Sequence, residues 1–139
     1  MIKKILVAGI FLLGSVQWGL AESPAPDNAT AYIISPQDGD TVTSPVTIRF
    51  GLTGMGVAPA GTDRAGTGHH HLLIDVDELP DPALPVPADE HHRHFGGGQT
   101  ETSLELEPGQ HSLQLLLGDW MHVPHVPAVT SEKIIITVR

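Results

Sequence analysis

The sequence contains no cysteine and few basic residues, and both shortages restrict what the protein can do. Without cysteine, the chain has no disulfide, no thiolate ligand for a metal ion and no cysteine nucleophile. Only seven lysine and arginine residues stand against sixteen aspartate and glutamate residues. An acidic surface repels nucleic acid and anionic lipid and favours cations, so we expect no nucleic-acid partner.

Long apolar runs are also missing, except for one at the amino terminus that has the form of a secretory signal. Lys3 and Lys4 precede the apolar residues 5–13, and Gly19-Leu20-Ala21 supplies the small residues that a signal peptidase requires. The run is too short and too interrupted for a membrane span, although an uncleaved anchor is the alternative. We therefore expect residues 1–21 to be a signal peptide and the protein to be periplasmic or secreted, with no membrane span after cleavage. The remaining chain keeps five basic and all sixteen acidic residues, which gives a formal charge of −11.

Familiar catalytic and calcium-binding motifs are absent from the sequence. It contains no G-x-S-x-G nucleophile elbow, no H-E-x-x-H zinc motif and no D-x-D-x-D-G calcium loop. We therefore expect a protein that is not an enzyme. A zinc hydrolase in which three histidines hold a metal with one open position for water stays as the catalytic alternative.

Alternating apolar and polar residues predict β-strands along most of the chain. The expected strands are residues 32–34, 46–52, 69–76, 101–107, 111–118 and 133–138. Twelve prolines and fifteen glycines leave little room for helix. The pattern predicts an all-β fold, an immunoglobulin-like antiparallel β-sandwich of about seven short strands. We expect one domain over residues 31–139, preceded by a flexible leader at residues 22–30.

All nine histidines lie between positions 69 and 125, and eight of them are candidate metal ligands. These eight are His69, His70, His71, His91, His92, His94, His122 and His125. Histidine is the commonest metal ligand, and sites rich in imidazole and free of cysteine suit zinc, copper(II) or nickel. Met55 and Met121 add thioethers, which suit copper(I). The sequence therefore predicts a metal ion, copper or zinc, as cofactor and partner.

An up-and-down strand order would bring these eight histidines to one end of the sandwich. The strand at 69–76 begins at that end, the strand at 111–118 finishes there, and the strand at 101–107 starts there. Pleating directs His69 and His71 to one face and His70 to the other. We rank His69, His71, His122 and His125 first as ligands, ahead of His91, His92 and His94. The ninth histidine, His111, falls at the far end and is interpreted as structural.

Two other functions are compatible with the same histidines. One is a structural or partner-binding envelope module whose imidazoles form a polar network without metal, in which case an envelope protein is the partner. The other is a pH-responsive adhesion or envelope module. Metal binding would require neutral imidazoles, so we expect the affinity to fall below about pH 6.

Several blocks of the sequence resemble an exported bacterial family known as domain of unknown function 4399. They are residues 51–61, 67–75, 87–89, 94–101, 108–119, 122–125 and 131–134. The resemblance covers nearly the whole chain after the signal and implies a small periplasmic β-domain. It implies no established activity. The family pattern includes the histidine blocks, with His111 among them.

Overall fold

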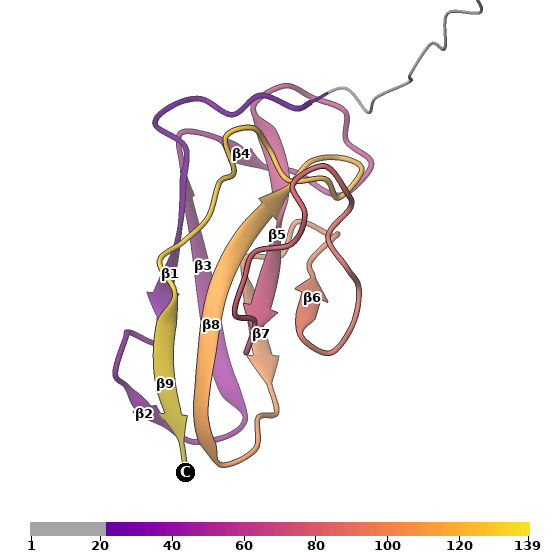
Figure 1. Cartoon of the computed structure of the whole chain (residues 1–139). Coiled ribbons are helices and arrows are strands. Elements are labelled where there is room, and N and C mark those ends of the chain that lie inside the picture. The colour runs from indigo at the N-terminus through magenta and orange to yellow at the C-terminus, as the bar shows by residue number, and fades with distance from the viewer. Residues whose placement is uncertain (1–21) are drawn as a thin grey trace, which may run out of the picture.

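This computed structural model describes residues 22–139 (Figure 1). These residues contain nine β-strands joined by loops, and no helix. The strands are β1 (Thr30–Ser35), β2 (Thr41–Val42), β3 (Val46–Thr53), β4 (Gly56–Val57), β5 (Thr67–Ile74), β6 (His92–His94), β7 (Glu101–Leu104), β8 (Gly109–Gly118) and β9 (Ile134–Val138). The expected signal peptide at residues 1–21 lies outside the described residues. Within the described part of the chain, no helix is long and apolar enough to span a membrane.

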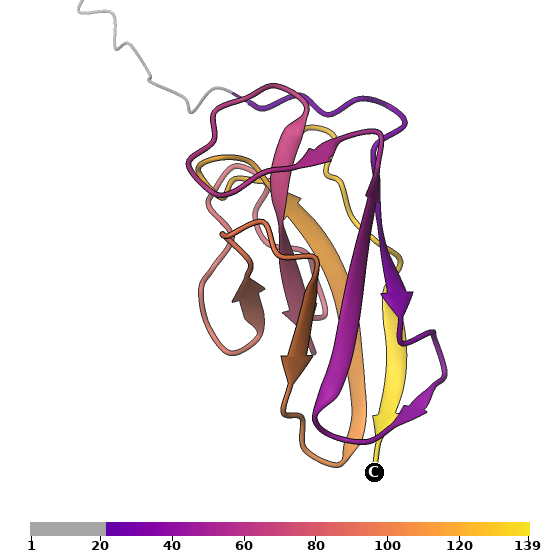
Figure 2. The same cartoon turned by 180° about the vertical axis from the view of Figure 1, so that it is seen from behind.

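The strands form two sheets, which Figures 1 and 2 show from opposite sides. The smaller sheet has the order β1-β3-β7, and the larger has the order β2-β9-β8-β5-β4, with β6 paired to β5. Neighbours are antiparallel except for the short parallel pairs β2/β9 and β4/β5. The predicted all-β sandwich is confirmed, and its sheet orders follow the immunoglobulin outline. The strands β2, β4 and β6 were not expected, because two or three residues are too few to show an alternation.

The core lies between the two sheets and is built by the alternation that the sequence shows. Leu113, Leu115 and Leu117 of β8 are fully buried, and they belong to one apolar cluster with Ile48 and Phe50 of β3. Each such side chain contributes about 1.5–3 kcal/mol when it leaves water. Leu72 and Ile74 of β5 belong to the same cluster, so this core packs β5 and β8 of the larger sheet against β3 of the smaller one.

The outer face of the larger sheet is also covered, which is unusual for an antiparallel sandwich. Leu73 of β5 and Leu116 of β8 form a second buried cluster with Val86, which belongs to the long connection between β5 and β6. The Val86 amide donates to the His122 carbonyl oxygen at 2.9 Å, so this connection also contacts the loop after β8. As a result β5 is buried on both faces over most of its length.

The amino-terminal segment, residues 22–29, contacts the loop between β8 and β9. The Ala25 amide donates to the Val126 carbonyl oxygen, and the Val126 amide donates to the Ser23 carbonyl oxygen, each at 3.0 Å. The Ser23 hydroxyl donates to Asp119 Oδ2 at 2.7 Å. The sequence predicted a loose leader here because the segment is polar and proline-bearing. The residues that bind this segment lie about a hundred positions further along the chain. The composition of the segment itself does not reveal these contacts.

Candidate metal centre

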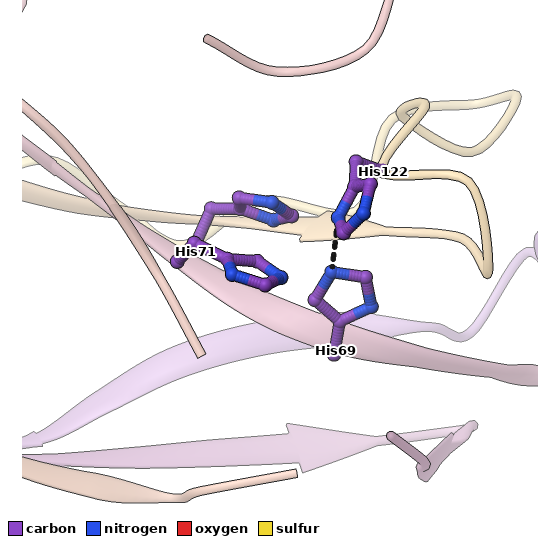
Figure 3. Close-up of side chains that lie close together, drawn as sticks. His69, His71 and His122 are labelled. Atoms are coloured by element: carbon purple, nitrogen blue, oxygen red, sulfur yellow. Dashed lines mark hydrogen bonds between the residues drawn. The ribbon is translucent and has the colours of Figure 1, made fainter. Parts of the chain in front are cut away.

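Four histidines from three separate segments meet on the outer face of the larger sheet. His69, His71, His94 and His122 each present one ligand nitrogen, and these four atoms lie within 4.8 Å of one another. We call these four residues the histidine cluster. Figure 3 shows the labelled rings of His69, His71 and His122 turned toward one another. The nitrogens around a tetrahedral zinc ion lie about 3.3 Å apart, so small side-chain rotations would bring the four into coordination range.

Strand geometry explains three of the four positions. His69 and His71 are two residues apart on β5, so the pleat directs both to the outer face. β6 runs antiparallel to β5, and its register places His94 directly opposite His71. Residues opposite each other in neighbouring strands present their side chains to the same face, so His94 joins the β5 pair.

The fourth position depends on the turn that follows β8. The Asp119 carboxylate accepts the amides of Met121 at 2.8 Å and Val123 at 3.0 Å through Oδ1. The His122 amide donates to the Asp119 carbonyl oxygen at 2.9 Å. His122 adopts a positive φ of 69°, which is uncommon for a residue with a side chain. The hydrogen bonds of Asp119 offset that strain and hold the His122 ring against His69, with Nδ1 3.0 Å from His69 Nε2.

Two glycines leave the space that the imidazoles occupy. A Cβ atom added to Gly118 would lie 2.6 Å from Cε1 of His71, and one added to Gly96 would overlap the ring of His94. Any larger residue at either position would displace a ring of the cluster. These glycines belong to the site although neither carries a ligand atom.

Burial lowers the pKa of three of the four clustered rings. Burial, followed by the neighbouring His122 and His94, lowers the pKa of His69 from 6.5 to about 4. Burial likewise lowers the pKa of His71 to about 3, helped by His69 and His94. The pKa of the exposed His94 is also lowered, first by its partial burial and then by His122. At neutral pH the rings of His69, His71 and His94 are therefore in the neutral form, which is the form that binds a metal ion.

The structure does not bring the other four candidate ligands into the cluster. His70 points to the opposite face of β5, as the pleat requires, and packs against the ring of Phe50 with centroids 5.3 Å apart. His125 is buried outside the cluster, and its Nε2 donates to the carbonyl oxygen of Thr67, the first residue of β5, at 3.1 Å. It was ranked among the first ligands, whereas His94 was ranked lower and is a member of the cluster.

His91 and His92 lie close to His94 in sequence but make separate contacts. His91 Nδ1 donates to the Ile74 carbonyl oxygen at 2.9 Å, and His92 Nδ1 lies 2.7 Å from Asp89 Oδ1. Both bonds turn the rings toward local partners. Of the three histidines in residues 91–94, the short strand β6 therefore places only His94 in the cluster.

His111 lies at the other end of the domain, as expected. Its Nδ1 is 2.7 Å from Asp75 Oδ2, and its Nε2 is 2.9 Å from the Glu107 carbonyl oxygen. Both partners are acceptors, so both ring nitrogens have to donate and the ring has to carry its proton. Burial acts against the charge, but the Asp75 bond and the Glu107 carbonyl outweigh it and raise the pKa of His111 above 6.5. The contacts agree with a structural role.

A family model described as a domain of unknown function, DUF4399, matches residues 48–139. The chain belongs to this family. The match confirms the resemblance seen in the sequence, and it contains all four members of the histidine cluster. No curated protein and no solved structure matches the chain. Since the description of DUF4399 names no ligand and no reaction, the function has to be argued from the site itself.

Proposed function

We propose that this DUF4399 protein binds one transition-metal ion, copper or zinc, through the imidazoles of His69, His71, His94 and His122. The single observation that carries the proposal is the convergence of four ligand nitrogens from β5, β6 and the loop after β8 within 4.8 Å. We also propose that the protein acts after export, in the periplasm or outside the cell, once residues 1–21 have been removed.

The unpaired nitrogens of the cluster support a metal site over a metal-free polar network. In a network, buried polar atoms pair with one another. Here Nδ1 of His69 and Nδ1 of His71 are buried and have no hydrogen-bond partner in residues 22–139. The one bond between members of the cluster joins His69 and His122. The cluster is therefore not the fully paired network that a metal-free structural role requires, whereas one cation can accept a lone pair from each of the four rings.

The donor set narrows the choice of metal. The cluster offers imidazole nitrogen alone, with no carboxylate and no thiolate. Calcium and magnesium prefer oxygen ligands, whereas zinc and copper bind imidazole well. When bound, the ion would be held by the two buried rings of β5 and by the more exposed rings of His94 and His122.

Two neighbouring histidines of β6 give a matched test. Calorimetric titration of the chelator-treated protein with zinc or copper(II), together with elemental analysis, should show one bound ion per chain. We expect His94→Ala to weaken binding by at least roughly tenfold, about 1.4 kcal/mol, because it removes one ligand. His92→Ala removes an imidazole from the same strand outside the cluster and should bind like wild type. Equal affinities for the two variants, or no bound metal in the wild type, would refute the proposal.

A further inference from the structure

A cavity of about 330 Å³ lies beside the metal centre and contains no member of the histidine cluster. Three segments form it: the amino-terminal segment, the loop before β5, and the loop after β8 that also carries His122. Its volume is at the lower end of the range for small-molecule sites, about 300–1,000 Å³. The cavity therefore fits a ligand of a few heavy atoms.

One wall of the cavity is apolar and open to solvent. Trp120 and Met121 line it with 40% and 38% of their surface exposed, and Val123 lies beside them. Large apolar side chains that stay exposed at a concave surface are typical of binding sites. This wall fits an apolar group of modest size.

Charged residues of both signs also line the cavity. Asp63 and Arg64 both line the cavity, and neither side chain has an ion-pair or hydrogen-bond partner within residues 22–139. Asp119 also lines the cavity, but its carboxylate already accepts three hydrogen bonds from the protein. Glu22 lines the cavity as well, again without a side-chain partner in the described residues. The charges available to a ligand are therefore the carboxylates of Glu22 and Asp63 and the guanidinium of Arg64.

A buried histidine forms part of the cavity wall. His125 lines the cavity and is 2% exposed. Because its Nε2 donates to the Thr67 carbonyl oxygen, its Nδ1 is left as an acceptor, and this atom is buried with no partner in the described chain. Because this atom has almost no accessible surface, His125 shapes the cavity wall and its Nδ1 does not contact a ligand.

We propose that this cavity binds an apolar α-amino acid as its zwitterion. The ligand's carboxylate pairs with Arg64, its ammonium group pairs with Asp63, and its side chain packs on Trp120 and Met121. An amino acid is the smallest common molecule that presents both charges and an apolar group together. The proposal goes beyond metal binding and uses no residue of the histidine cluster.

Calorimetry on chelator-treated protein, purified as cells produce it, tests the assignment with three probes of the same shape. L-leucine carries both charges, L-leucinamide lacks the carboxylate, and 4-methylpentanoate lacks the ammonium group. We expect binding of L-leucine and at least roughly tenfold weaker binding of the other two, since each loses one charged hydrogen-bonding partner. Arg64→Gln should weaken L-leucine binding to a similar extent.

Arg49→Gln is the matched control, because Arg49 pairs with Glu101 on the smaller sheet, away from the cavity. It should bind L-leucine like wild type. The His94→Ala variant should also keep L-leucine binding, which separates this proposal from the metal proposal. The assignment is overturned if L-leucine gives no binding heat, if the three probes bind equally, or if the two arginine variants behave alike.

Discussion

The Nε2 atom of His69 lies 3.0 Å from the Nδ1 atom of His122, although the two residues are 53 positions apart in the chain. Between neutral imidazoles, a contact of this length is a hydrogen bond in which one ring donates and the other accepts. A metal ion bound by both atoms has to replace that shared proton. The hydrogen bond therefore holds the two ligands close together before the ion arrives, which reduces the ordering that binding requires.

The space left by Gly118 leads to a first prediction. Gly118→Ala places a methyl group 2.6 Å from His71 Cε1, so the ring or the strand has to shift. We expect a loss of roughly 1–3 kcal/mol in the free energy of unfolding and weaker metal binding, measured by urea denaturation and by calorimetry. The control is Gly56→Ala, whose new Cβ meets nothing closer than Thr67 Cγ2 at 3.9 Å. Similar losses in both variants would contradict the packing argument.

The role of Asp119 in shaping the loop leads to a second prediction. Asp119→Ala removes the acceptor that fixes the amides of Met121 and Val123, and it frees His122 from its strained conformation. Groups that orient metal ligands typically change affinity by about 10–100-fold, so we expect a loss in this range although no ligand is altered. Ser23→Ala removes only one of the three bonds to the carboxylate and should have a smaller effect. An unchanged affinity for Asp119→Ala would show that the loop does not position His122.

The charged ring of His111 leads to a third prediction, on pH. Because the folded-state pKa of His111 is raised above 6.5, its contribution to stability is fully present below pH 6.5 and is lost as the pH rises through the raised pKa. The wild type should therefore exceed His111→Gln in stability by more at about pH 5.5 than at about pH 9. Urea denaturation of both proteins at each pH gives this difference. A gap that stays constant between the two pH values would show that the ring is not charged in the folded state.

The fold was predictable from the sequence because alternation marks long strands directly. The apolar positions of β3, β5 and β8 identified both the strands and the faces that form the core. The same pleat placed His69 and His71 together and His70 apart from them. These conclusions need only the geometry of single strands and the order in which they pair.

The complete histidine cluster was not predictable, because its other members depend on register and loop conformation. His94 is selected over His92 by its pairing with His71 in a strand of three residues. His122 is selected over His125 by a turn that Asp119 stabilises and that includes a positive φ. The one sequence signal for these choices was glycine, since Gly96 and Gly118 are the positions where the rings need space.

The hydrogen bond between Ser23 and Asp119 has a practical consequence for the placement of purification tags. The amino-terminal segment lies against the loop that carries His122, whereas the carboxyl terminus lies at the opposite end of the domain (Figure 1). A purification tag joined just ahead of Glu22 would enter the neighbourhood of the imidazoles, and a polyhistidine tag there would compete with them for the ion. A fusion at the carboxyl end keeps foreign residues away from both the ligands and the adjoining cavity.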